Sequence, residues 1–154
     1  AFLKELDRLS PEIVLIATTN LFENLDKAVT RRFDAIIDFD RYTDEDKVEV
    51  ATIILNELLK QFKNVARDLK LFKKIINSAN VIPNPGDLRN AIRTSLAFSD
   101  PSDPHDYQKR LLRSLHNGRN LSISKLSNLG FTVREIEILT GVSKSSVSRE
   151  LSED

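Results

Sequence analysis

Residues 13–39, IVLIATTNLFENLDKAVTRRFDAIIDF, decide the fold expected for the first part of the chain. Ile13–Ala17 is continuously apolar and rich in β-branched residues, which is typical of a strand buried on both faces of a parallel sheet. Ala35–Phe39 predicts a second short strand, and Leu25 and Val29 mark a helix between the two. This order predicts a small α/β remnant, with two strands of an incomplete sheet.

Amphipathic helices follow this remnant. Thr43 and Asp46 have the spacing of a capping box, and the apolar residues after them repeat on one helical face. A second apolar stripe comes next, and Asn84 followed by Pro85 has the residue types that begin a third helix. We expect these helices to form a small domain over residues 41–99, so that the fold class is mainly α.

Further along, the polar and proline-rich stretch at 100–104 predicts a linker. Beyond it the apolar pattern predicts one helix and then three short helical pieces, separated by Gly130 and Gly141. The expected parts are therefore a core remnant at 1–40, a helical domain at 41–99, the linker at 100–104 and a trihelical domain at 105–154.

Composition excludes several classes of protein. Lysine and arginine number 23, as do aspartate and glutamate, so no global field attracts the chain to nucleic acid or membrane. The chain has no cysteine and only two histidines, which excludes a disulfide framework, a zinc site and a cysteine nucleophile. Without an apolar span or a signal peptide we expect a cytoplasmic protein with no membrane partner. Because methionine is absent even at position 1, we expect a fragment of a longer protein.

Three polar residues of the first part are candidate functional residues. Asn20 follows the first predicted strand, at the sheet edge where α/β proteins bind ligands, and its amide can orient a water beside a γ-phosphate. The alternative is an asparagine that only forms a turn. Arg31 and Arg32 end the predicted helix. The alternative to a functional role is that their positive charges only interact favourably with the negative end of the helix dipole.

Together, ATTN at 17–20 and LDKAVTRRFD at 25–34 resemble the second half of the nucleotide-binding domain of AAA+ ATPases. The resemblance implies that Asn20 is the sensor-1 asparagine. It also implies that Arg31 or Arg32 is the arginine finger that reaches the nucleotide of a neighbouring subunit in a homo-oligomeric ring, and we favour Arg32. A planar, permanently charged guanidinium suits the charge on a transferring phosphoryl group.

The helices at 41–99 resemble the lid that follows an AAA+ core, and PGDLRN at 85–90 is similar to the GDLR pattern of clamp-loader-like lids. That resemblance implies a sensor-2 role for Arg89, in contact with the phosphates of its own subunit. The alternative is a solvated helix arginine. ATP and Mg²⁺ are the cofactors that the resemblance implies for the longer protein.

The sequence departs from the family pattern in one respect, the residues that hold a triphosphate and its magnesium ion. No Gly-x-x-x-x-Gly-Lys-Ser/Thr loop occurs in the sequence, and no apolar strand ends in an acidic pair that would hold magnesium. We therefore expect that the chain neither binds nor hydrolyses ATP by itself. Its sheet is expected to stay incomplete unless another chain supplies the remaining strands.

The sequence TVREIEILTGVSKSSVSREL at 132–151 has the pattern of a helix-turn-helix. Thr132 and Glu135 form a capping box, Gly141 permits the turn, and Val147 is the inward apolar residue of the second helix. The stretch resembles the trihelical DNA-binding domains of resolvases, transposases and bacterial regulators. It departs from them at Glu137, where alanine is usual, so this side chain must turn outward or widen the packing.

The resemblance implies that the last helix binds double-stranded DNA through short donors and two cations, which suit phosphates and base edges. The predicted DNA-binding residues are Ser143, Lys144, Ser145, Ser146, Ser148 and Arg149. The alternative is a helical hairpin that binds protein or caps the lid.

The function expected from these patterns is that of the C-terminal part of a DNA-associated AAA+ ATPase. Core and lid would sense nucleotide, and the helix-turn-helix would bind DNA. This expectation rests on family analogy. Two rival functions remain: a non-enzymatic DNA-binding regulator, and an AAA+ protein remodeller whose terminal helices recruit a protein client.

Overall fold

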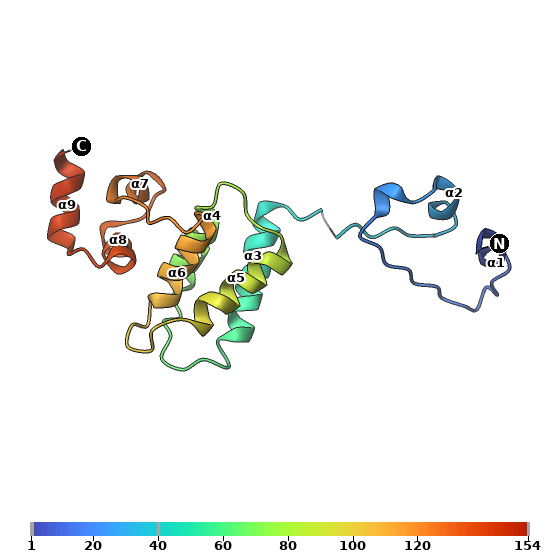
Figure 1. The fold of residues 1–154 in the computed structure, drawn as a ribbon, viewed down its shortest axis with the longest axis horizontal. Helices are drawn as coiled ribbons and strands as arrows, with labels where there is room; N and C mark the ends of the chain where they lie inside the picture. The colour runs from blue at the N-terminus through green and yellow to red at the C-terminus, as the bar shows by residue number, and fades with distance from the viewer. Residues whose placement is uncertain (1, 40, 154) are drawn as a thin grey trace. The chain divides into compact units, whose positions relative to one another are not determined.

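The computed structural model describes residues 2–39 and 41–153, which divide into two units, Ala1–Phe39 and Asp40–Asp154 (Figure 1). Each unit is considered by itself. The described residues are mainly helical, which confirms the predicted fold class.

The first unit contains short helices joined by extended chain. Its helices are α1 (Phe2–Leu6), the 3₁₀ helix η1 (Phe22–Asn24) and α2 (Lys27–Thr30). Helix α2 starts where it does because the Asp26 carboxylate accepts a hydrogen bond of 2.8 Å from the backbone N–H of Ala28.

The two predicted strands are not formed in the described part of the chain, and this expectation was wrong. Ile13–Ala17 and the described backbone at 35–39 pair with no other strand. Extended backbone becomes a strand only when a neighbouring strand accepts and donates its ladder hydrogen bonds. Val14 and Ile16 are 86% and 82% exposed as a result, although the apolar composition is that of a buried strand.

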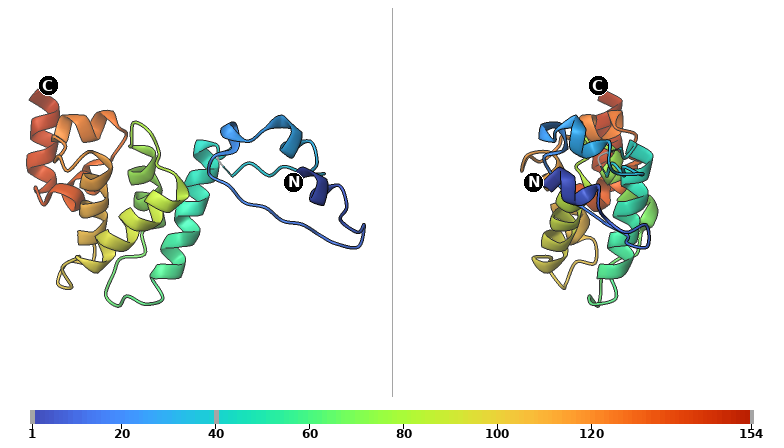
Figure 2. Two further views of the ribbon diagram at one scale, coloured as in Figure 1. Left: turned by 45° about the vertical axis from the view of Figure 1, so that its right-hand side comes forward. Right: turned by 90° about the vertical axis from the view of Figure 1, so that its right-hand side faces the viewer.

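The second unit begins with four helices that pack together: α3 (Asp44–Leu58), α4 (Leu69–Asn77), α5 (Pro85–Ala97) and α6 (Asp106–Leu115). Helix α3 packs against α4 and α5. Helix α6, which follows them in the chain, also packs against α4 and α5. Figure 2 shows this group of helices from two further directions.

The helix starts in this group follow the sequence signals closely. Thr43 and Asp46 form the predicted capping box, with the Thr43 backbone N–H donating to the Asp46 carboxylate at 2.9 Å. Asn84 occupies the N-cap of α5 and Pro85 its first position, also as predicted. The Asn84 side chain makes no capping hydrogen bond, so the proline at the first position, which needs no N–H partner, is what favours this start.

The connection between α3 and α4 is held in place by two side chains of α6. Tyr107, which is fully buried, donates its hydroxyl proton to the carbonyl oxygen of Ala66 at 3.0 Å. Gln108, also fully buried, donates to the carbonyl of Asp68 at 3.1 Å. In addition the Ala66 N–H donates to Pro104 at 2.8 Å. These bonds satisfy backbone groups that no helix or sheet satisfies, and they fix the path of the connection.

Three shorter helices complete the second unit: α7 (Ile123–Asn128), α8 (Val133–Thr140) and α9 (Lys144–Glu153). Thr132 and Glu135 form the predicted capping box at the start of α8. Gly141 ends α8 in the left-handed conformation, with φ of 76°, a backbone state that glycine adopts without steric cost. Ile136 and Val147 are fully buried where the three helices meet.

Helix α6 packs against helices that precede it and against one that follows it. It contacts α4, α5 and α8, and one continuous cluster of buried apolar residues extends from α3 to α9. Residues 100–104 form turns that bring α6 back against α5. The division into a domain at 41–99 and another at 105–154 stays a prediction.

Candidate functional site

The predicted nucleotide-sensing residues lie on both units. Asn20, Arg31 and Arg32 belong to the first unit, and Arg89 belongs to the second. Asn20 sits at a bend just before η1, is exposed, and makes no side-chain hydrogen bond with other described residues. Arg31 caps the C-terminus of α2 and is also exposed without an ion-pair partner in the described part of the chain. Both side chains are therefore available to a ligand.

Arg32 is held by a carboxylate that the sequence analysis did not find. Its Nε and Nη2 atoms lie 2.6 Å and 3.0 Å from the two oxygens of Asp7, and its Nη1 donates to the carbonyl of Ala28 at 2.5 Å. The hydrogen bonds from Arg32 lower the pKa of Asp7 below its ordinary value, and those to Asp7 raise that of Arg32. Asp7 thus fixes the guanidinium in a two-point pair of the kind that arginine also makes with phosphate.

Arg89 has a similar partner on the neighbouring helix. Its Nη2 atom lies 2.9 Å from Oε2 of Glu57 on α3, and the two side chains are 50% and 54% exposed. An ion pair this exposed is weak, because water screens it and both long side chains lose freedom to form it. Arg89 can therefore exchange this carboxylate for another anion.

The predicted DNA-binding residues form one exposed surface at the start of α9 and along it. The hydroxyl oxygen of Ser143 lies 3.1 Å from those of Ser145 and Ser146, so the Ser143 side chain bonds to both. Arg149 is exposed and has no ion-pair partner among the described residues. All six predicted residues are exposed: Ser143, Lys144, Ser145, Ser146, Ser148 and Arg149.

Glu137 places a carboxylate beside this surface. Its side chain turns outward from α8, where Oε1 accepts a hydrogen bond of 3.2 Å from the backbone N–H of Lys144 and Oε2 lies 3.9 Å from the Lys144 ammonium. A carboxylate at a helix N-terminus is favoured by the helix dipole, so Glu137 stabilises the start of α9. Helix α9 itself carries no acidic residue before Glu150, but α8 supplies one in Glu137.

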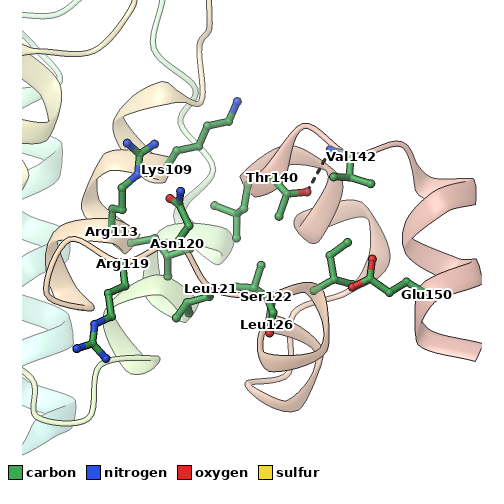
Figure 3. Close-up of a pocket in the computed structure, with 13 residues that line it drawn as sticks. Lys109, Arg113, Arg119, Asn120, Leu121, Ser122, Leu126, Thr140, Val142 and Glu150 are labelled. Carbon is green, nitrogen blue, oxygen red and sulfur yellow. Dashed lines mark hydrogen bonds between the residues drawn. The ribbon is translucent and has the colours of Figure 1, made fainter. Parts of the chain in front are cut away.

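A cavity of about 460 Å³ lies between α6 and the three later helices (Figure 3). Sequence reasoning missed it because its lining combines side chains of α6, the segment after it and the three later helices, and the packing of these elements is not readable from local patterns. Arg113 and Arg119 both line it, but Figure 3 shows their guanidinium groups pointing to different sides, so the two charges do not converge on one position.

No group of histidine, cysteine or acidic side chains that suits a metal ion occurs among the described residues. The sequence also contains no loop that cradles a triphosphate. Without such a loop the residues present do not fit a triphosphate and its Mg²⁺ held by this chain alone, and the roles expected of Asn20, Arg31 and Arg89 stay predictions.

Comparison with known protein families gives a match at the start of the chain. Residues 1–41 match the model of the AAA family, described as ATPase family associated with various cellular activities. This match supports the predicted resemblance of the first unit to part of an AAA+ ATPase. No curated protein and no solved structure matches the chain. None of the helices in the described ranges is long and apolar enough to cross a membrane.

Proposed function

We propose that this chain is the nucleotide-sensing and DNA-binding part of an AAA+ ATPase that works as a ring of identical subunits. The observation that carries the proposal is the AAA match over residues 1–41, which spans Asn20, Arg31 and Arg32. The GDLR pattern around Arg89 and the three-helix arrangement of α7–α9 support it from the second unit.

On the nucleotide side, the proposed roles follow from the side chains themselves. The Asn20 amide has both a donor and an acceptor, which is what orienting a water beside a phosphate requires. One of Arg31 and Arg32 stabilises charge on the nucleotide of a neighbouring subunit, and Arg89 senses the nucleotide of its own. Another part of the assembly must hold the triphosphate and its Mg²⁺.

A calorimetric titration tests this division of roles. The 154-residue chain titrated with ATP and Mg²⁺ is expected to give no binding heat, because nothing in it cradles a triphosphate. Binding in the micromolar range would contradict the proposal. Reading the coding sequence upstream of residue 1 provides a second check, since the proposal requires a phosphate-binding loop there and a DNA-binding regulator does not.

On the DNA side, we propose that α9 enters the major groove. Lys144 lies at the start of the helix, where its charge adds to the positive end of the dipole and suits a phosphate. Arg149 suits a phosphate or the edge of a guanine. With roughly three phosphate contacts per copy, binding by one chain is weak, and several copies acting together are needed for useful affinity.

Fluorescence anisotropy with duplex DNA at low salt tests the α9 proposal. Lys144→Ala and Arg149→Ala are each expected to weaken binding, whereas Arg93→Ala, which removes an exposed arginine from α5, serves as the matched control. Glu137→Gln keeps the acceptor for the Lys144 N–H but removes the negative charge, so we expect roughly twofold to fivefold tighter binding. If neither alanine variant differs from Arg93→Ala while all stay folded, α9 does not bind DNA.

A further inference from the structure

The connection before α4 and the outer face of α4 carry a concentration of positive charge. Five exposed cationic side chains lie within fourteen consecutive residues: Lys60, Lys63, Arg67, Lys70 and Lys73. We refer to these five residues as the basic surface. None of them has an ion-pair partner in the described part of the chain. The acidic residue within this stretch, Asp68, directs a carboxylate oxygen to the backbone N–H of Leu71 at 2.9 Å and so caps α4.

Elsewhere in the second unit the described cations are mixed. Lys47, Lys74, Arg89, Lys109 and Arg110 face a carboxylate, whereas others such as Arg93 and Arg149 do not. What distinguishes the basic surface is that five exposed cations follow one another within fourteen residues. Cations gathered without counter-charges repel one another, and an anionic partner relieves that repulsion. The charge pattern therefore indicates a binding surface for an anion with many charges.

The structure also fixes where this charge lies. Tyr107 and Gln108 hold the backbone at Ala66 and Asp68 from the buried side, as described above, so the connection that carries Lys63 and Arg67 follows a set path. A surface ordered in advance loses less conformational entropy when it binds.

Helix α4 adds the second part of the basic surface. Its buried residues, Leu71, Phe72, Ile75 and Ile76, face the core. Lys70 and Lys73 are three positions apart and exposed, so they are neighbours on the opposite face, about 5–6 Å apart at their Cβ atoms. In the sequence the two lysines follow directly on the cations of the connection.

We propose that the basic surface binds the phosphodiester backbone of a double-stranded nucleic acid. Duplex DNA carries one negative charge per about 1.7 Å of its axis, so it offers many phosphates to a group of exposed cations that lack counter-charges. A protein partner fits less well, because lysine is depleted in protein interfaces and their cores need apolar anchors. The larger apolar residues of this stretch, Phe62, Val65 and Leu69, are partly buried against the protein's own core. The inference does not depend on α9 or on nucleotide sensing.

The test compares two triple variants of the 154-residue chain that lose the same charge. Lys63→Gln/Lys70→Gln/Lys73→Gln removes three cations of the basic surface, and Lys4→Gln/Lys27→Gln/Arg93→Gln removes three exposed cations elsewhere. Binding of duplex DNA and duplex RNA of equal length is measured between low and moderate salt. The basic-surface variant is expected to flatten the slope of log affinity against log salt by about 2 to 3, since each phosphate contact contributes about 0.9. The control variant is expected to change the slope by less than one.

Two further measurements complete the test. The variant Lys63→Arg/Lys70→Arg/Lys73→Arg keeps the charge and is expected to keep the slope, and circular dichroism checks that each variant remains folded. Equal losses in RNA and DNA binding are expected, because the surface contacts phosphates.

The inference is overturned if the wild type binds neither duplex, or if the two glutamine variants behave alike. It is also overturned if the basic-surface variant only loses self-association in sedimentation, since the partner is then an acidic surface of a second copy. Because Lys144 and Arg149 stay unchanged in these variants, failure of the α9 proposal gives a different pattern of results.

Discussion

The ammonium of Lys74 on α4 lies 2.7 Å from Oε2 of Glu135 on α8, and the same ammonium donates to the carbonyl of Gly130 at 3.0 Å. It also lies 6.0 Å from the centre of the Phe131 ring. One lysine of the four-helix part is thereby bonded to the turn before α8 and to the capping box that starts it. Partial burial raises the pKa of Glu135, but hydrogen bonds from Lys74 and from Thr132 outweigh it, so the net pKa is lowered.

Lys74→Met is expected to lower the free energy of unfolding by about 1–2 kcal/mol, because it leaves the largely buried carboxylate of Glu135 without its charged donor. Lys73→Met, at the exposed neighbouring position, is the matched control and is expected to change stability by less than about 0.5 kcal/mol. Urea unfolding gives both values. Combining Lys74→Met with Glu135→Gln should cost less than the sum of the single changes, and strict additivity would show that the pair contributes nothing.

The second prediction concerns pH and His116. This side chain is buried at the end of α6, with Nε2 3.0 Å from the hydroxyl oxygen of Ser78. Since that hydroxyl donates its proton to Ile75 at 2.7 Å, Nε2 is the donor between the two. Burial lowers the pKa of His116 below 6.5, and the nearby Lys125 lowers it further. The unfolded chain therefore takes up a proton at a higher pH than the folded chain does.

Stability is expected to be constant above the unfolded pKa of 6.5 and to fall as the pH drops through the range below it. His116→Gln retains a side-chain donor and cannot titrate, so it should remove most of this decline. Thermal unfolding of both proteins across that range is the measurement. A decline of the same size in the variant would assign it to other groups.

Two glycines are expected to respond to alanine in opposite directions. Gly141 has φ of 76°, which strains any residue with a Cβ, and Gly141→Ala should destabilise the chain by about 1 kcal/mol. Gly86 lies in the first turn of α5 with open space around an added Cβ, so Gly86→Ala should stabilise by about 0.5 kcal/mol. Chemical denaturation measures both. Destabilisation by both substitutions would mean that the alanine Cβ atom, and not the backbone conformation, decides the effect.

The fourth prediction concerns the two adjacent arginines in an ATPase assembly that contains this chain. Removing an arginine finger typically costs ~10³-fold or more in rate while nucleotide binding persists. We expect this of Arg32→Ala, with activity recovered when its subunits are mixed with subunits inactivated at their own phosphate loop. Asp7→Asn releases Arg32 from its carboxylate and should not reduce the rate.

The same mixing experiment on Arg31→Ala decides between the two residues. If Arg31→Ala is inactive and rescued while Arg32→Ala keeps its rate, the pair with Asp7 is structural and Arg31 is the finger. If mixed rings form but neither variant is rescued, no arginine acts across the subunit boundary.

Local signals in the sequence predicted the helical fold well. The capping boxes at Thr43 and Thr132, the proline that opens α5 and the glycine that ends α8 each act within a few residues, and the structure confirms all four. The predicted strand at 13–17 failed because a strand depends on partners elsewhere, which apolar composition does not report.

The candidate site was predictable only in part, for the same reason. Sequence motifs selected Asn20, Arg32 and Arg89, but the partners of the two arginines come from 25 and 32 positions away. Nothing in the local sequence of Asp7 or Glu57 indicates these pairs. The roles of all the predicted site residues stay predictions until they are tested.

The position of α6 bears on how such a chain can change in evolution. Because Tyr107 and Gln108 hold the connection before α4, and α6 packs on α4 and α5, a recombination event at 100–104 would separate α3–α5 from the helix that completes their packing. A crossover in the exposed segment 117–120, just after α6, would leave that packing intact while exchanging α7–α9. Related proteins that share α3–α6 but differ in their terminal module are therefore expected to diverge after His116, and not at the proline-rich turn.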